Sequence, residues 1–418
     1  MRNLHRTLRP ESVYFILSGV SAFADATMWT VGTVYYVTAV GLNPLQLVLV
    51  GTVLETTYFL FEVPTGVVAD TYSRRLSVII GMLLLGAAFV LVGAAPLFLL
   101  VLFGQVISGI GYTFLSGATE AWLADEVGEE NVGRIYLRSA QLSRLLGLAG
   151  TAASVALASI ALNAPFIVGG VLYLALGVFL ALGMSEHGFR PAPRGERTSW
   201  GAMGRTFREG AQQVRRSPVL LTLFAVGVFA GAASEGFDRL GDAHLLANFR
   251  FPALGALKPV VWFGIIDVTI SLICLAVNEL FRRRLEVTTR NPIATARILL
   301  FFNLLSIASI IAFGLAGNFN LAFGALIVKA VAGSLIGPLY NAWLVQNIRP
   351  SVRATVISMI GQADSLGQIA GGPGVGLVGT VFSLRAAIVL TGTLLSPISL
   401  LYARVLRRGK LEALPSEV

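Results

Sequence analysis

The fold is decided by the stretch Glu62-Val-Pro-Thr-Gly66-Val-Val-Ala-Asp70-Thr-Tyr-Ser-Arg74-Arg75, in which an apolar run ends in an acid followed by two adjacent arginines. Asp70 lies at the C-terminal end of a predicted helix, where the macrodipole disfavours an anion, so we expect it to pair elsewhere. The apolar runs on either side of the stretch are long enough for helices that cross a membrane. The stretch therefore marks a short charged turn between two membrane-spanning helices.

The composition of the 418-residue chain extends this interpretation to its whole length. Hydrophobic residues make up 55% of the chain and charged residues only 13%, with a mean hydropathy of +0.77. A soluble domain carries about a quarter charged residues, so the composition argues against a water-soluble enzyme. A spanning helix needs roughly 20 apolar residues, and the apolar runs predict twelve such helices. The single Cys274 and three scattered histidines indicate neither a disulfide framework nor a metal site, and we expect no cofactor.

The distribution of Lys and Arg sets the expected orientation, because cytoplasmic loops retain positive charge. With both termini inside, most of the 31 basic residues fall in cytoplasmic segments, whereas the opposite loops hold Arg250, Lys258 and Arg385. We predict a multi-pass protein of a bacterial-type plasma membrane with both termini cytoplasmic. The net charge of +9 follows from this bias at an anionic membrane surface, so nucleic acid is not expected as a partner.

An internal repeat relates the two halves of the chain. Glu120-Ala-Trp-Leu123 recurs as Asn341-Ala-Trp-Leu344 at the equivalent point of each half. The repeat predicts a duplication of six helices. We expect an N-terminal six-helix bundle over residues 1–184, a cytoplasmic linker over 185–217 and a C-terminal six-helix bundle over 218–418.

The linker carries an amphipathic pattern. Its apolar residues Trp200, Met203, Phe207 and Val214 follow helical spacing, and arginines occupy the positions between them. This pattern predicts a helix that lies on the membrane surface.

Ionisable residues inside the predicted spans are costly and therefore serve as functional hypotheses. We expect the helices that carry them to line an aqueous cavity between the two halves. The candidates for proton coupling or for the substrate cavity are Asp25, Glu55, Tyr112, Glu120, Arg144, Asp267, Lys329 and Asp364. Asp25 and Asp364 are the first candidates for coupling, because a carboxyl group desolvated near the midplane can exchange a proton near neutral pH. Alternatively, Arg144 and Lys329 neutralise acids in structural salt bridges.

Two further helices carry polar patterns. On the fourth predicted helix, residues three or four apart form one expected polar face; they are Gln105, Ser108, Tyr112, Ser116 and Glu120. The seventh helix has four charged residues, which predict either an outer gate or a self-compensated network. They are Glu235, Asp238, Arg239 and Asp242. His244, near the same end, is expected to be solvated.

The opening stretch resembles the signature G-x-x-x-D-x-x-G-R-R/K of the major facilitator superfamily, with Thr71 and Ser73 in place of the usual basic residue and glycine. With twelve spans and the duplication, the resemblance covers essentially the whole chain. It implies an all-α membrane protein of twelve transmembrane helices in two pseudo-symmetric six-helix bundles. Gly66 would let helices pack closely, and Asp70 would pair with the arginine of its loop and with the start of helix 11. The implied cytoplasmic gate consists of Glu62, Gly66, Asp70, Arg74, Arg75 and Arg353.

The resemblance is to the drug:proton antiporter branch, and it implies a secondary active transporter, not an enzyme, that works by alternating access. We expect a monomer in the lipid bilayer that exports amphipathic drugs or small metabolites in exchange for protons. The chain departs from that branch at Gln105, where an arginine is usual, and in placing its Gly-Pro run at Gly371-Gly-Pro-Gly374. The alternative is a proton symporter or facilitator that imports an organic anion or sugar. A non-transport membrane enzyme or receptor is a remote alternative.

Overall fold

The structure is a computed structural model, and it describes residues 8–190, 208–209, 211–255, 257–288, 291–349 and 353–408. Every regular element within these ranges is a helix, which confirms the predicted all-α fold. Of the predicted amphipathic linker helix, Trp200, Met203 and Phe207 lie outside the described residues. Val214 lies within them and is buried in a hydrophobic core of the C-terminal half.

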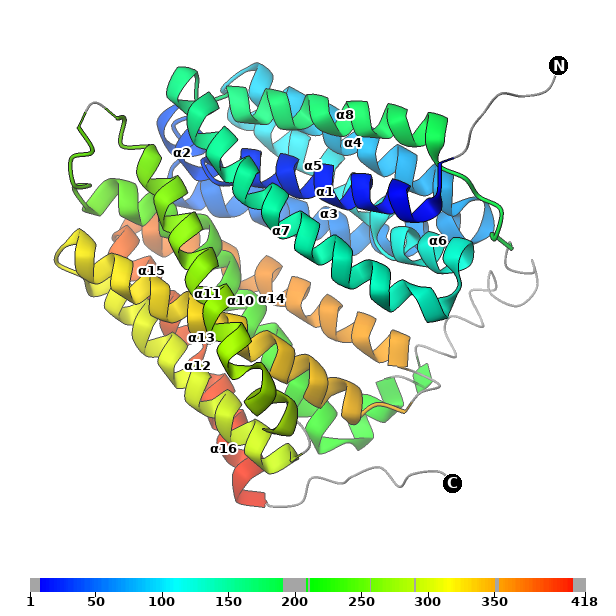
Figure 1. The fold of residues 1–418 in the computed structure, drawn as a ribbon. Helices are drawn as coiled ribbons and strands as arrows, with labels where there is room; N and C mark the ends of the chain where they lie inside the picture. The colour runs from blue at the N-terminus through cyan, green and yellow to red at the C-terminus, as the bar shows by residue number, and fades with distance from the viewer. Residues whose placement is uncertain are drawn as a thin grey trace. The chain divides into compact units, whose positions relative to one another are not determined.

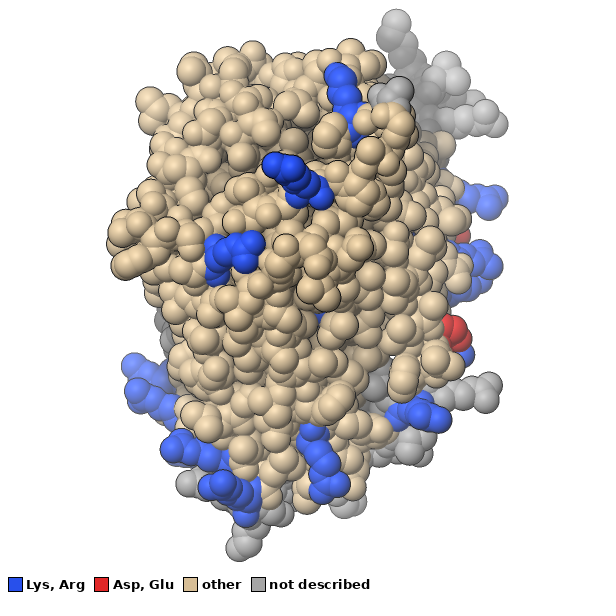
Figure 2. All heavy atoms as spheres, turned by 90° about the vertical axis from the view of Figure 1, so that its left-hand side faces the viewer, with Lys and Arg blue, Asp and Glu red and all other residues tan. Residues whose placement is uncertain are grey.

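Twelve long helices or helix pairs can be counted in the described part of the chain. Ten of them are long and apolar enough to cross a membrane. The other two are α1 (Pro10–Trp29), which continues as α2 (Gly32–Thr38), and α14 (Arg353–Val381). The face drawn in Figure 2 consists almost entirely of uncharged residues, and the charged side chains visible on it are mainly basic. Such an uncharged exterior suits contact with lipid, where an exposed charge is costly.

The first compact unit comprises residues 1–42, 53–199 and 253–268. Within it, α1 packs against α7 and α8, and α4 packs against α5 and α8 (Figure 1). The helices that contribute to this unit are α1, α2, α3 (Pro44–Thr71), α4 (Arg74–Ala94), α5 (Phe98–Leu115), α6 (Ala118–Val127), α7 (Glu129–Ile160), α8 (Ala164–Gly183) and the start of α11 (Val261–Thr288).

Two glycines set the close approach of α4 and α8. A methyl group added at Gly86 would lie 2.7 Å from the backbone nitrogen of Leu174, and one at Gly170 would lie 2.7 Å from that of Val90. Helices in membranes associate through small residues that let their backbones come together. These positions therefore explain why α4 and α8 make one of the most extensive helix pairs of this unit.

The second unit comprises residues 43–52, 200–252 and 269–418. Within it, α10 packs against α14 and α15, and α12 packs against α13. The helices that contribute to this unit are the start of α3, α10 (Pro218–Asn248), most of α11, α12 (Pro292–Leu315), α13 (Phe319–Gln346), α14, α15 (Leu384–Leu394) and α16 (Ser396–Arg408).

The repeated Ala-Trp-Leu motif is a buried anchor in each unit. Trp122 and Trp343 are each only 1% exposed. Trp122 Nε1 donates a 2.6 Å hydrogen bond to the carbonyl oxygen of Ser185. Trp343 Nε1 has no hydrogen-bond partner among the described residues, and its ring packs against Tyr402 with a centroid distance of 6.1 Å. The two copies therefore share burial but differ in polar contacts.

The fourth span is broken where one continuous helix was predicted. α5 ends at Leu115, Gly117 has a φ of 70°, and α6 begins at Ala118. Glycine adopts such a left-handed conformation without steric penalty, and the helix is interrupted there. The break lies within the expected polar face, with Gln105 buried in α5 and Glu120 exposed on α6.

Candidate functional site

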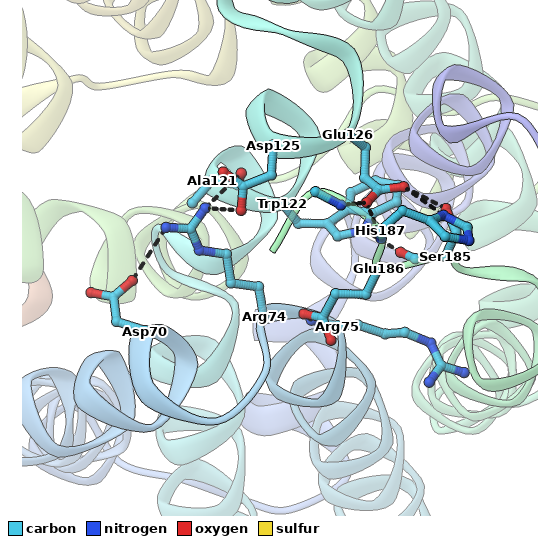
Figure 3. Close-up of polar contacts among 11 residues, drawn as sticks. Asp70, Arg74, Arg75, Ala121, Trp122, Asp125, Glu126, Ser185, Glu186 and His187 are labelled. Atoms are coloured by element: carbon cyan, nitrogen blue, oxygen red, sulfur yellow. Dashed lines mark hydrogen bonds and ion pairs between the residues drawn. The ribbon is translucent and has the colours of Figure 1, made fainter. Parts of the chain in front are cut away.

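Arg74 is the centre of a polar cluster at the start of α4 (Figure 3). The side chain of Ser73 caps this helix by accepting a 2.9 Å hydrogen bond from Leu76 N, which places Arg74 at its first position. Arg74 Nη1 donates to the carbonyl oxygen of Ala121 at 3.0 Å and to Asp125, and Arg74 Nη2 lies 3.5 Å from Asp70 Oδ1. The guanidinium therefore joins the end of α3 to α6, across the start of α4.

A short segment after α8 is held by α6. Glu126 accepts hydrogen bonds from Ser185 Oγ at 2.7 Å, His187 N at 2.5 Å and Gly188 N at 2.7 Å (Figure 3). Trp122, one turn earlier on α6, donates to the carbonyl oxygen of Ser185. We call residues 185–189 the post-α8 segment. Its backbone amides and one hydroxyl satisfy a side chain of Glu126 that is only 4% exposed.

The post-α8 segment also contacts the start of α4. Glu186 accepts hydrogen bonds from Ser73 Oγ at 2.6 Å and from Arg75 N at 2.9 Å. An anion at this position is favourable, because the first turn of a helix leaves amide groups unpaired and carries the positive end of the dipole. Arg75 Nη2 donates to the carbonyl oxygen of Ala181, and the Arg74 guanidinium lies 5.8 Å from the ring centre of Phe189.

We call the residues joined by these contacts the α4 cluster. Asp70, Arg74 and Arg75 lie in the cluster, with the predicted pairing of Asp70 and Arg74 present. The cluster also includes residues that the sequence interpretation missed, namely Asp125, Glu126, Ser185, Glu186 and His187.

Three residues of the implied gate are not members of the α4 cluster as defined above. Glu62 is half-buried on α3, two turns before Asp70, and Arg353 begins α14 in the second unit with an exposed side chain. Within its own unit, a methyl group added at Gly66 would meet no described atom within 4 Å. The close helix packing implied for Gly66 stays a prediction.

Asp25 of α1 is bound by Tyr173 of α8. Tyr173 Oη donates a 2.7 Å hydrogen bond to Asp25 Oδ1, and the Tyr173 side chain is 2% exposed. Tyr173 in turn lies within electrostatic range of Tyr112 on α5. Asp267, also in the first unit, lies against Thr30. The candidate acids Asp25 and Asp267 are thus held by hydroxyl groups.

A second group of acids surrounds Tyr58 of α3. The Tyr58 phenol group interacts electrostatically with three acids, Glu55, Glu62 and Glu120. It donates a 3.0 Å hydrogen bond to Ser116 Oγ. Glu120 also lies within range of Tyr14 and Tyr136, whose ring centres are 5.7 Å apart. Arg144 of α7 has an exposed side chain, and it forms no ion pair with a described acid within 4 Å.

In the second unit, three of the four charged residues of α10 take part in two separate ion pairs. Arg239 Nε lies 3.2 Å from Glu235 Oε1, which confirms the pairing expected for residues four apart. Asp238 instead pairs with Lys329 of α13, at 3.9 Å. Asp242 is half-buried on the same helix.

Asp364 and His244 are two further polar groups of the second unit. Asp364 of α14 accepts a 2.8 Å hydrogen bond from Gln368 Nε2. His244 is fully buried, with Nε2 3.2 Å from the carbonyl oxygen of Phe313 and Nδ1 3.0 Å from the Asn248 amide nitrogen. The expectation of a solvated His244 is therefore wrong, because the ring packs edge-on against Phe249 and Phe313.

Comparison with known proteins shows the same fold over nearly the whole chain. The nucleoside transporter NupG superposes with a TM-score of 0.76 at 14% identity, covering 95% of this chain and 99% of that one. A POT family transporter in complex with 5-aminolevulinic acid gives a TM-score of 0.75 at 13% identity, with coverages of 97% and 98%. A bacterial homologue of the human lysosomal transporter Spinster, inward-facing and unoccupied, gives 0.75 at 15% identity, with coverages of 95% and 96%.

Sequence comparison adds the family. The uncharacterized MFS-type transporter YxaM of Bacillus subtilis (strain 168) is 23% identical over 401 residues, covering 93% of this chain and 94% of that protein. Residues 14–284 match the sequence profile of the Major Facilitator Superfamily. The predicted twelve-helix architecture, the helical units and these matches agree, and the chain belongs to the Major Facilitator Superfamily as a multi-pass membrane transporter.

Proposed function

We propose that this transporter exports amphipathic drugs or small metabolites in exchange for protons, by alternating access, as in the drug:proton antiporter branch. The two six-helix bundles over residues 1–184 and 218–418 would be the moving halves of a monomer. Both termini would be cytoplasmic, and the α4 cluster would belong to the cytoplasmic gate. The four charged residues of α10 would contribute to the outer gate; they are Glu235, Asp238, Arg239 and Asp242.

The contact between Asp25 and Tyr173 carries this proposal. At a rise of 1.5 Å per residue, Asp25 lies about 22 Å from the start of α1. It is near the middle of the span that α1 and α2 form together. Its hydrogen-bond partner is the neutral Tyr173, and no described Lys or Arg forms an ion pair with it. A carboxyl group in a span is costly unless it has a functional or structural partner. One that is held by a neutral hydroxyl can change its protonation state without leaving a cation unpaired.

Asp364 supports the same interpretation in the second unit. At a rise of 1.5 Å per residue, Asp364 lies about 17 Å from the start of α14. The amide group of Gln368 is its 2.8 Å hydrogen-bond partner. Asp364 is therefore the second candidate for the coupling carboxyl group.

The test is transport by the full-length chain in proteoliposomes with an imposed pH gradient. Ethidium serves as the amphipathic probe, and pyranine inside the vesicles reports proton movement. We expect ethidium transport driven by the gradient, with opposite proton flux, and we expect Asp25→Asn to abolish the coupling of the two. Glu129→Gln, at an exposed first-turn position of α7, is the matched control and should behave as the wild type. Coupled flux that survives Asp25→Asn would remove that residue from the coupling role.

The second candidate function is proton symport or facilitated import of an organic anion or sugar. Lys329 favours it, because a cation in the middle of a span suits an anionic substrate. The direction of gradient-driven transport separates the two functions. A drug-susceptibility panel in an efflux-deficient host provides the same discrimination in cells, since export predicts raised resistance and import does not.

A further inference from the structure

Lys329 and Asp238 form an ion pair inside the second unit, within the membrane-spanning length of α13 and α10. Lys329 is about 15 Å from the start of α13 at Phe319, and Asp238 is about 15 Å from the end of α10 at Asn248, at 1.5 Å per residue. The two helices have 28 and 31 residues, so Lys329 lies about 5 Å and Asp238 about 8 Å from the midpoint of its own helix, and both are well inside the spans.

An aromatic ring supports the ammonium group of Lys329. Its Nζ lies 4.0 Å from the ring centre of Phe237. Phe237 is 9% exposed, and its ring packs against Phe313 with a centroid distance of 5.8 Å, so the aromatic face is fixed. A ring face attracts a cation without occupying its N–H donors. The three donors of the ammonium group therefore remain for an anion.

The anion that Lys329 meets in this structure is loosely held. Lys329 Nζ lies 3.9 Å from Asp238 Oδ1, and the side chains are 31% and 63% exposed. The neighbouring pair of Arg239 and Glu235 is closer, at 3.2 Å, and Glu235 is only 2% exposed. One ion pair of α10 is thus packed into the protein, whereas the other presents an accessible carboxylate to a cation on another helix. Only the second arrangement lets an outside anion replace the carboxylate without unpacking the core.

We infer that Lys329, resting on Phe237, is the subsite for the carboxylate group of a transported organic anion, and that Asp238 occupies this subsite when no substrate is bound. The inference rests on the proposed function as a transporter, and it names a chemical class for the substrate. Asp238 and the substrate carboxylate compete for the same ammonium donors. Removing Asp238 and removing Lys329 therefore have opposite effects on the binding of an organic carboxylate.

The test compares two probes of nearly equal shape, 2-naphthoate and its neutral amide 2-naphthamide. Their binding to the full-length chain is measured in nanodiscs, with protein-free nanodiscs as the background. We expect the wild type to prefer 2-naphthoate, and we expect Lys329→Gln to remove that preference. Asp238→Asn should strengthen 2-naphthoate binding by about tenfold, because the probe then meets no competing carboxylate at the ammonium group. Binding of 2-naphthamide should change little in either variant.

Two further variants keep the result interpretable. Lys329→Arg preserves the cation and should preserve the preference for the carboxylate. Lys258→Gln removes a lysine whose Nζ donates to the carbonyl oxygen of Ser159 in the first unit, and it should match the wild type. Thermal midpoints show whether each variant is folded, and Asp238→Asn tests the inference even if Lys329→Gln does not fold.

The inference is overturned if the wild type shows no preference, if the preference survives Lys329→Gln, or if Asp238→Asn weakens 2-naphthoate binding. Binding does not depend on a pH gradient, so this result is separate from the flux assay. A chain that binds 2-naphthoate through Lys329 without proton-coupled flux contradicts the proposed coupling alone. A chain with coupled flux and a preference insensitive to Lys329 contradicts this inference alone.

Discussion

The hydroxyl group of Tyr173 on α8 donates a 2.7 Å hydrogen bond to Oδ1 of Asp25 on α1. Tyr173 is almost fully buried, and its ring contacts Phe89 at a centroid distance of 5.9 Å. The phenol group is therefore fixed by packing, and it sets the position of the Asp25 carboxyl group. Tyr173 is a positioning residue for the proposed coupling step.

Replacing Tyr173 with Phe tests this role. The change removes one hydrogen bond to a charged group while it keeps the ring, and such a bond contributes about 1.5–3 kcal/mol. We expect gradient-driven transport in proteoliposomes to fall about tenfold or more, with a smaller change in substrate binding. Tyr35→Phe, which removes a hydroxyl bonded to the carbonyl oxygen of Val92, is the matched control. Equal losses in both variants would indicate a general packing effect.

Disrupting the α4 cluster should lower stability in a non-additive way. Arg74→Gln and Asp125→Asn each remove one partner of the same contact, and each should cost about 1–3 kcal/mol. The double variant should cost less than the sum of the two, because residues in one network are coupled. Thermal midpoints in detergent provide the measurement. Arg134→Gln, from an exposed pair with Glu11, should cost less than about 1 kcal/mol. Additive losses would show that Arg74 and Asp125 act independently.

The two repeated tryptophans should respond differently to the same substitution. Trp122→Phe removes the hydrogen bond to Ser185 and leaves a buried acceptor, at a cost of about 1–3 kcal/mol. Trp343→Phe removes a buried N–H group that has no described hydrogen-bond partner. It should therefore lower the free energy of unfolding by less than Trp122→Phe does. Paired thermal midpoints compare them, and limited proteolysis reports on the post-α8 segment. A larger loss for Trp343→Phe would contradict the assignment.

Enlarging either glycine between α4 and α8 should destabilise the first unit. Gly86→Val and Gly170→Val would each place methyl groups against the neighbouring backbone, and such overpacking costs about 1–3 kcal/mol. Gly147→Ala on α7 is the control, because an added methyl group there meets no atom of the described residues within 4 Å. Fluorescence-detected gel filtration after heating measures the loss. Unchanged stability in Gly86→Val would show that the two helices can separate without cost.

The elements of the fold were predictable because apolar runs and their interruptions determine where spans begin and end. The fourth span shows the limit of this approach. Its apolar pattern continues past Gly117, and the non-helical backbone of Ser116 and Gly117 divides α5 from α6. A glycine in an apolar helix is a common packing residue, so the sequence alone does not distinguish a break from a contact.

The α4 cluster was predictable only where its members are close in sequence. Asp70 and Arg74 are four residues apart, and their pairing follows from helix geometry and the end charge of α3. Asp125 and Glu126 follow Trp122 in the same helix, and no local pattern connects them with Arg74 or with the post-α8 segment. Glu186 lies more than a hundred residues from Arg75 and has no local pattern that connects them. His244 was wrongly expected to be solvated for a similar reason. The Phe313 carbonyl group that it contacts lies near the end of α12, far from His244 in sequence.

The attachment of the post-α8 segment to α6 and α4 has a practical consequence for protein engineering. Ser185, Glu186, His187 and Gly188 all supply atoms to the hydrogen bonds described above. A tag, fusion partner or protease recognition sequence inserted among them would break several of these bonds at once. Split versions and reporter fusions of this transporter should therefore leave these residues intact, although their polar composition resembles that of a dispensable tether.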